Sequence, residues 1–208
     1  MDKQFREIKS RGVAFDTVYT PKPVALKMIE MCDLKPGDTV LDPCYGGGVF
    51  YENLPDYVDK EFCEIELALD FFDYEDRVDC VVGNPPYSLW SKWLRHTVKI
   101  TDKFCYIFGN LNFTDKRVRE ILDAGFGITK FHLVKINWWF SPSYLVVFEK
   151  NKPSIITVEP KPILCDVCNG ICKRGRDGNS YNTCAASRLV NGLNLGRQAD
   201  LVKHLGTK

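Results

Sequence analysis

The chain has 208 residues, of which 45% are hydrophobic and 26% are charged, with a formal net charge of +1. These proportions exclude a chain that is disordered throughout, and the length fits one medium domain with at most a small appendage. The longest apolar runs, residues 105–108 and 145–148, are far shorter than the roughly 20 residues that cross a bilayer. The polar residues 1–11 do not resemble a signal peptide. We therefore expect a cytoplasmic protein without a membrane partner.

The charges are distributed unevenly along the chain. Residues 1–149 contain 18 Lys and Arg against 23 Asp and Glu, a net charge of −5, whereas residues 150–208 contain 10 against 4, a net charge of +6. A basic appendage on an acidic body suits a polyanion such as a nucleic acid, although a basic tail also increases solubility. Prolines cluster just after residue 150, where the net charge changes sign. We predict a domain at 1–150, a linker at 151–163 and a cysteine-rich tail at 164–208.

Helix and strand patterns alternate along the first 150 residues. Thr20-Pro21 is a helix-start signal, in which the Thr20 hydroxyl is expected to cap the helix and Pro21 to take its first position. Apolar residues at helical spacing follow up to about Cys32. After a turn at Pro36-Gly37-Asp38 a short buried strand is expected at 39–41. Further strands are predicted at 62–63, 79–82, 104–108, 128–134 and 144–148, and further helices at 89–98 and 116–124. This alternation predicts an α/β fold with a mostly parallel sheet and helices on both faces.

A glycine-rich segment follows the first predicted strand. Asp42 ends the strand, and Pro43-Cys44-Tyr45-Gly46-Gly47-Gly48 follows directly. Glycines at this place let a ligand approach the backbone, and ligands bind beyond the strand ends of open α/β sheets. The pattern of a phosphate loop, with its Gly-Lys-Ser/Thr ending, is absent. The segment predicts a ligand loop, with a tight structural turn as the alternative.

A second segment, Asn84-Pro85-Pro86-Tyr87, follows the strand predicted at 79–82. Prolines have no backbone N–H, so the loop offers carbonyl acceptors without competing donors. The Asn84 side-chain oxygen and the Pro85 carbonyl can accept the two N–H groups of a planar amine while Tyr87 stacks on its ring. The alternative is a rigid loop that only ends the strand.

Together the two segments resemble S-adenosylmethionine-dependent amino-methyltransferases, specifically the DNA adenine-N6 group with an Asn-Pro-Pro-Tyr loop. The resemblance covers about residues 13–150 and implies a Rossmann-like class I methyltransferase fold. It implies that adenine is methylated at its exocyclic N6 after the base leaves the helix. RNA adenine and protein glutamine methyltransferases share the loop, and a catalytically silent DNA-binding module is the alternative from another class. The small size is similar to that of phage enzymes, so the host cell would be bacterial.

The resemblance also implies roles for single residues. It assigns catalysis to Asn84, Pro85, Pro86 and Tyr87. Glu64 matches the acid that holds the ribose of S-adenosylmethionine, and Asp70 and Phe71 match the residues that hold its adenine. Only five residues separate Glu64 from Asp70, where the family inserts a helix. The residues assigned to the cofactor are Tyr19, Thr20, Asp42, Cys44, Gly46, Gly48, Glu64, Asp70 and Phe71. Residues 138–140 and 144–150 match the closing hairpin of the family's sheet.

The tail contains four cysteines within twenty residues: Cys165, Cys168, Cys172 and Cys184. The first pair has zinc-knuckle spacing, and four thiolates complete a tetrahedral structural zinc site. A disulfide pair and free thiols are the alternatives, of which a reducing compartment disfavours the first, and His204 could replace Cys172 as a ligand. Lys173, Arg174 and Arg176 lie between the last two cysteines, where a zinc site would hold them against the phosphates of DNA or RNA.

The remaining candidates have ordinary structural explanations. Five cysteines have apolar neighbours and are expected to be reduced core thiols: Cys32, Cys44, Cys63, Cys80 and Cys105. His96 and His132 are expected to be ordinary helix or strand residues. Trp90 and Trp93 fit a buried helix face better than a surface on which bases stack. Trp138 and Trp139 are expected on opposite faces of a strand.

Overall fold

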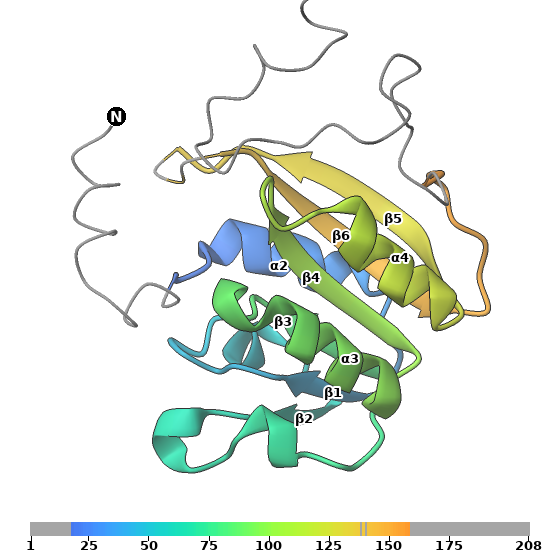
Figure 1. Ribbon diagram of the computed structural model, residues 1–208. Helices are drawn as coiled ribbons and strands as arrows, with labels where there is room; N and C mark the ends of the chain where they lie inside the picture. The colour runs from blue at the N-terminus through green and yellow to red at the C-terminus, as the bar shows by residue number, and fades with distance from the viewer. Residues whose placement is uncertain (1–17, 138, 140, 159–208) are drawn as a thin grey trace, which may run out of the picture. The chain divides into compact units, whose positions relative to one another are not determined.

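The computed structural model describes residues 18–137, 139 and 141–158. They contain a six-stranded sheet of order β2-β1-β3-β4-β6-β5 (Figure 1). Strands β1, β2, β3 and β4 pair in parallel, whereas β6 is antiparallel to both β4 and β5. The mostly parallel sheet predicted from the sequence is therefore confirmed. The strands are β1 (Thr39–Asp42), β2 (Asp59–Phe62), β3 (Cys80–Gly83), β4 (Lys103–Gly109), β5 (Phe126–Val134) and β6 (Ser143–Lys150).

Three α-helices in the described part cover both faces of the sheet, as predicted (Figure 1). Helix α2 (Lys22–Met31) buries Ala25 and Met28 in one core cluster, which includes Ile107 and Val147 from the sheet. Helices α3 (Trp90–Ile100) and α4 (Asp115–Asp123) pack on the other face, in a second cluster with Phe104 and Phe148. The sheet thus separates two apolar layers.

The helix ends differ in how closely they follow the sequence signals. Thr114 caps α4, since its hydroxyl accepts a hydrogen bond from the Arg117 N–H at 3.4 Å. The predicted cap Thr20 does not cap α2, because Pro21 occupies the N-cap position and no side chain accepts a bond there. The prediction of a Thr20 cap was therefore wrong, although the helix itself is present.

The connection from β2 to β3 contains two short 3-10 helices, η3 (Ile65–Leu67) and η4 (Phe71–Asp73). Glu64 caps η3 and Asp70 caps η4, because each side chain accepts the backbone N–H two residues ahead. No α-helix lies between these two acids. The five-residue spacing seen in the sequence therefore corresponds to a single 3-10 turn, which leaves both acids beside the carboxyl end of the sheet.

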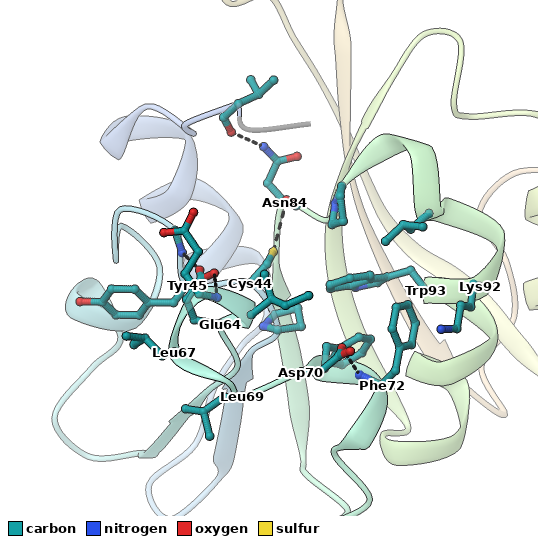
Figure 2. Close-up of a pocket in the computed structure, with 18 of the residues that line it drawn as sticks. Cys44, Tyr45, Glu64, Leu67, Leu69, Asp70, Phe72, Asn84, Lys92 and Trp93 are labelled. Atoms are coloured by element: carbon teal, nitrogen blue, oxygen red, sulfur yellow. Dashed lines mark hydrogen bonds between the residues drawn. The ribbon is translucent and has the colours of Figure 1, made fainter. Parts of the chain in front are cut away.

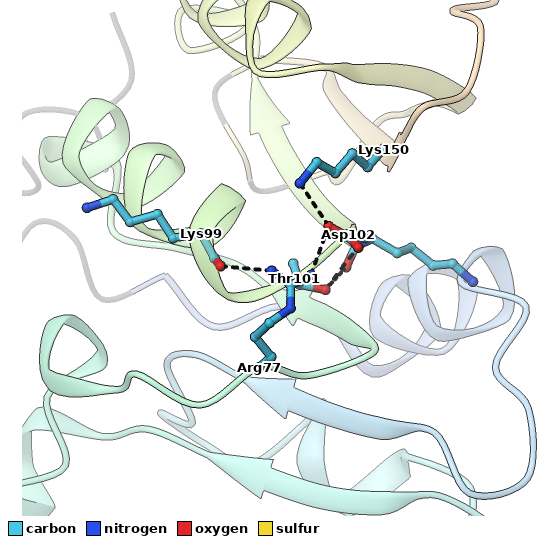
Figure 3. Close-up of polar contacts among 6 residues, drawn as sticks. Arg77, Lys99, Thr101, Asp102 and Lys150 are labelled. Carbon is cyan, nitrogen blue, oxygen red and sulfur yellow. Dashed lines mark hydrogen bonds and ion pairs between the residues drawn. The ribbon is translucent and has the colours of Figure 1, made fainter.

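A network of ion pairs lies at the opposite, amino end of the parallel strands (Figure 3). The Asp102 carboxylate pairs with Arg77 at 2.9 Å and with Lys150 at 3.3 Å. Arg77 also donates to the main-chain oxygen of Lys99 at 3.1 Å. The cations of this network are thus neutralised by a carboxylate within it.

The outer edge of β5 is covered by the chain that follows β6. The Ile128 N–H donates to the Ser154 hydroxyl at 3.0 Å, and the Ile155 N–H donates to the Ile128 oxygen at 2.8 Å. Residues 154 and 155 therefore satisfy backbone groups of β5 that would otherwise face outward.

Within the described residues, no helix is long and apolar enough to cross a membrane. The five cysteines of this part are free thiols, as predicted. Among the same residues no group of His, Cys, Asp and Glu side chains is arranged to hold a metal ion. The predicted zinc ligands in the tail lie outside the described residues.

Candidate active site

A cleft of about 700 Å³ lies at the carboxyl ends of β1, β2 and β3, next to the start of α3 (Figure 2). This is the position in which open α/β sheets bind ligands. Eight residues predicted from the sequence line it: Tyr19, Cys44, Gly46, Glu64, Asp70, Phe71, Asn84 and Pro86. The two sequence segments and the two acids are therefore brought together in one cavity.

Asp42 organises the glycine loop from beneath. Its side chain is fully buried, and its two oxygens accept the N–H groups of Cys44 at 3.2 Å and Tyr51 at 3.4 Å. Burial raises the pKa of the Asp42 carboxyl to about 7, although the two backbone hydrogen bonds lower it. Asp42 does not line the cleft, so it holds the loop in place from behind.

The backbone conformation of the loop explains why two of its residues are glycines. Gly46 and Gly48 have φ of +52° and +75°, in the left-handed region that glycine adopts most easily. A Cβ at Gly48 would lie 2.6 Å from the Tyr45 hydroxyl oxygen and 2.9 Å from Glu52 Oε1. Gly48 is buried and lies outside the cleft lining, so its role in this structure is to permit the turn.

Glu64 connects the end of β2 to the glycine loop. Its carboxylate accepts the Gly46 N–H at 2.7 Å through one oxygen and the Glu66 N–H at 3.2 Å through the other. Each carboxylate oxygen can accept a further bond, so ligand hydroxyls can still bind there. Glu64, Glu66 and Asp70 line the cleft together with one cation, Lys92. This lining favours a ligand with positive charge.

Aromatic rings form one wall of the cleft. Phe71 stacks on Trp93 with ring centroids 4.4 Å apart, and Phe72 meets the same indole edge-on at 5.3 Å. The Lys92 ammonium lies 3.6 Å from the centre of the Phe72 ring. The Asp70 carboxylate, which accepts the Phe72 N–H at 2.9 Å, lies beside this wall. A flat heterocycle with an exocyclic amino group fits such surroundings.

Asn84 lies at the other end of the cleft from Asp70 (Figure 2). Its Nδ2 donates to the Val18 oxygen at 2.9 Å, and its main-chain oxygen accepts the Cys44 thiol at 3.3 Å. Its Oδ1 is buried and has no hydrogen-bond partner within the described residues. The amide is thus held by its nitrogen, which leaves its oxygen as an acceptor for a donor from a ligand.

The rest of the Asn-Pro-Pro-Tyr segment lies around this acceptor. Pro86 lines the cleft, whereas Pro85 is buried and, like Tyr87, is absent from the lining. The Tyr87 ring stacks on Trp90 with centroids 6.1 Å apart and an interplanar angle of 16°. It also lies close to Gly109, where a Cβ would be 3.7 Å from the ring. Tyr87 therefore faces the end of β4 rather than the cleft.

Several other predictions can be compared with the structure. Thr20 is buried and does not line the cleft. Trp90 and Trp93 are core residues as expected, although Trp93 also lines the cleft. Trp139 lies in a bend after β5, so the prediction that it belongs to a strand was wrong; the closing antiparallel pair is β5 with β6. The predicted contacts of Lys173, Arg174 and Arg176 lie outside the described residues.

Sequence reasoning missed part of the lining, including Lys92 and three exposed leucine and isoleucine residues of the η3 region. Ile65, Leu67 and Leu69 are 73%, 60% and 46% exposed and lie at the mouth of the cleft. Their alternation with Glu66 and Ala68 is the pattern of a strand with one buried face, which gives no signal of a cleft. Lys92 carries no motif of its own.

No family model matches the sequence, and no match was found among curated proteins. Solved structures do resemble the chain. A proposed RNA methyltransferase from Pyrococcus horikoshii has a TM-score of 0.54 and 17% identity over 68% of this chain and 90% of its own. The fold is that of Rossmann-like methyltransferases.

Two further structures have the same fold. A modification subunit of a proposed type I restriction enzyme from Vibrio vulnificus has a TM-score of 0.52 and 18% identity, over 73% of this chain and 48% of its own. A precorrin-6y C5,15-methyltransferase from Geobacter metallireducens has a TM-score of 0.51 and 13% identity, over 64% of this chain and 90% of its own. Because these proteins act on different molecules, the likeness establishes the fold and leaves the substrate to the site itself.

Proposed function

We propose that this protein transfers a methyl group from S-adenosylmethionine to the exocyclic N6 of adenine in DNA. The observation that carries the proposal is the unpartnered Oδ1 of Asn84, at the end of a cleft in a methyltransferase fold. A buried acceptor without a partner costs free energy, so it is typical of a position that a ligand completes. The donor that would complete it here is an amino group.

The cleft fits S-adenosylmethionine in size and charge. Its volume of about 700 Å³ is within the usual range for ligand sites. The acidic lining suits a molecule that carries a sulfonium and an ammonium group. We assign the ribose hydroxyls to Glu64, and the adenine to Asp70 and the wall of Phe71, Phe72 and Trp93. When bound, this molecule supplies an electrophilic methyl group.

The contribution of the protein to the reaction is mainly positioning. The lone pair of an exocyclic adenine nitrogen is delocalised into the ring, which makes the nitrogen a weak nucleophile. Asn84 Oδ1 and the Pro85 carbonyl would accept its two N–H groups, favour a pyramidal nitrogen and direct its lone pair toward the methyl carbon. No strong base is needed before attack. As the N–C bond forms and the sulfur–methyl bond breaks, the sulfur leaves as a neutral thioether, and the nitrogen becomes acidic and releases its proton to water.

Other amine substrates would fit the same acceptors. RNA is the second candidate, because 90% of the chain of a proposed RNA methyltransferase aligns with this fold. Protein glutamine is disfavoured by the basic residues 150–208. We therefore place nucleic-acid adenine first and DNA ahead of RNA, on the resemblance of the Asn-Pro-Pro-Tyr segment to DNA enzymes. The predicted domains and the zinc site in the tail remain part of this proposal.

The test is incubation with methyl-labelled S-adenosylmethionine and DNA, RNA or protein, followed by nucleoside and amino-acid analysis. We expect N6-methyladenine in DNA. Asn84→Ala should lower the rate by far more than about tenfold, roughly 1.4 kcal/mol of barrier, while S-adenosylmethionine still binds.

The matched control is Asn53→Ala. The Asn53 amide also donates to a main-chain oxygen at 2.9 Å, but it does not line the cleft. It should leave the rate nearly unchanged. Equal rates for the two variants, or label only in protein, would contradict the proposal, and no binding of S-adenosylmethionine would indicate a catalytically silent module.

A further inference from the structure

Three cations stand at the carboxyl edge of the sheet, on the side away from the cofactor cleft. Strands β4 and β5 end at this edge, at Gly109 and Val134. Helix α4 starts there, which places Lys116 and Arg117 in its first turn, and Lys135 follows β5 directly. Lys116 and Lys135 are exposed. These three residues belong to no motif that the sequence analysis identified.

Within the described part of the chain, none of these cations pairs with a carboxylate. Arg117 donates to the main-chain oxygen and to Oδ1 of Asn112 at 3.2 and 3.0 Å, and Lys135 donates to the Trp139 oxygen at 2.7 Å. Asp115, the acid of this turn, is already paired with Arg119 at 2.7 Å. At the amino edge, by contrast, Asp102 neutralises two cations (Figure 3). The part of the carboxyl edge beside β4 and β5 thus retains uncompensated positive charge.

The turn between β4 and α4 is held in a fixed position. The rings of Phe113, Phe131 and Tyr144 pack against one another, with centroids 5.2 to 5.5 Å apart. The Tyr144 hydroxyl donates to Asn110 Oδ1 at 3.3 Å. These contacts join the turn to β5 and β6, so the cations stand on an ordered surface that needs little rearrangement to bind a ligand.

The two segments of the chain that build the first and second halves of the sheet differ in charge. Residues 52–79, which include β2 and its connections, contain 11 Asp and Glu against 2 Lys and Arg. Residues 80–135 contain 9 Lys and Arg against 4 Asp and Glu. A polyanion would be repelled from the first half and attracted to the second.

We propose that Lys116, Arg117 and Lys135 bind the phosphates of the nucleic-acid strand that presents the target base. This inference rests on the proposed function and adds the surface on which the substrate lies. The Tyr87 ring adjoins Gly109 at the end of β4, so a strand held on this surface runs beside the loop that contains Asn84. The cofactor would bind on the side of the sheet that contains β2.

The test uses the full chain and a fluorescein-labelled 20-nucleotide DNA, single-stranded and as a duplex, with anisotropy measured from low to moderate salt. Lys116→Glu with Lys135→Glu should weaken binding about tenfold or more and flatten the log–log salt slope by about 0.9 per lost contact on the duplex and about 0.7 on the single strand. Arg117 is left intact because it supports Asn112.

The matched control is Lys99→Glu with Lys152→Glu. Both of these lysines are exposed at the amino edge, Lys99 in the last turn of α3 and Lys152 after β6. The change in net charge is the same as in the first double variant. The control should keep the affinity and the slope within about twofold. S-adenosylmethionine affinity, measured by calorimetry, should be unchanged in both double variants.

The possible results separate this inference from the proposed function. If the wild type binds and methylates DNA but the two double variants have the same slope, the surface assignment is wrong while the function stands; such a result would assign the phosphates to the tail. If the wild type binds neither the single-stranded nor the duplex DNA, both are wrong. A loss of DNA affinity and a flatter salt slope in the Lys116→Glu, Lys135→Glu variant alone support the proposed phosphate-binding surface.

Discussion

Strands β1, β2 and β3 have four residues each, whereas β4, β5 and β6 have seven, nine and eight. In the first half, most residues lie in connections, and these connections line the cleft. In the second half, long paired strands bury a dense set of rings, among them Phe104 and Phe148 stacked 4.8 Å apart. The comparison indicates that one half supplies the site while the other supplies rigidity.

The largest expected effect is in the half with long strands. Phe148→Ala removes a fully buried ring, and we expect a loss of about 3 to 5 kcal/mol in the free energy of unfolding, measured with urea. Phe62→Ala, on the half-buried strand β2, should cost clearly less. Equal losses would contradict the division between the two halves.

The next effect concerns pH and the half that forms the site. The pKa of Asp42 is raised from 3.8 to about 7 in the folded chain, so between these values the folded state keeps a proton that the unfolded state releases. The contribution of this carboxyl to the free energy of unfolding therefore falls as pH rises from 3.8 to about 7, by up to about 4 kcal/mol in total. Above about pH 7 it stays constant.

Asp42→Asn cannot titrate at this position. Its stability relative to the wild type should rise between about pH 4 and 7 and stay level above that, as followed by urea midpoints. Parallel pH profiles for the two proteins would show that the carboxyl is ionised throughout this range.

A smaller effect distinguishes the free-energy cost of a strained turn backbone from the cost of steric contact inside the turn. Gly48→Ala and Gly37→Ala both place alanine at positive φ, which costs about 1 to 2 kcal/mol. The new Cβ meets Tyr45 and Glu52 at Gly48, but it meets nothing within 4 Å at Gly37. We expect Gly48→Ala to lose a further 1 kcal/mol or so and to weaken S-adenosylmethionine binding, measured by calorimetry. Weakened binding in Gly37→Ala as well would point to a general loss of folding.

The smallest effect should be the same in both halves. Lys60→Met breaks the ion pair with Asp56 at 3.2 Å, and Lys150→Met breaks the pair with Asp102 at 3.3 Å. Since exposed ion pairs contribute little, each change should cost less than about 1 kcal/mol in urea unfolding. A much larger loss in either half would mean that charge, rather than packing, distinguishes them.

The fold was predictable where local patterns agree with tertiary contacts. The stripe of Trp90, Trp93 and Leu94 predicted α3, and the predicted strand at 144–148 lies within β6. Strand β2 was misplaced to 62–63, because it is an edge strand of charged and half-buried residues with little apolar signal. Edge strands need few apolar residues, so composition alone locates them poorly.

The candidate site was predictable where backbone chemistry is encoded in residue type. Glycines and prolines indicated the loops around Gly46 and Asn84, and both line the cleft. Lys92 and Lys116 were missed, because an isolated lysine has no local signal and acquires meaning only from the groups that the fold places beside it. Tyr87 was expected to stack on the ring of the target base; in this structure its ring stacks on Trp90, a contact that only packing determines.

The covering of β5 by residues 154 and 155 has a practical consequence for any shortened version of the chain. An uncovered nine-residue edge strand exposes backbone donors and acceptors that can pair with another molecule and start aggregation. A chain cut at Lys150 would lose the Ser154 and Ile155 bonds and expose this edge, whereas one that ends after Val158 would keep them. Shortened proteins for crystallisation or for removal of the tail should therefore end beyond residue 158.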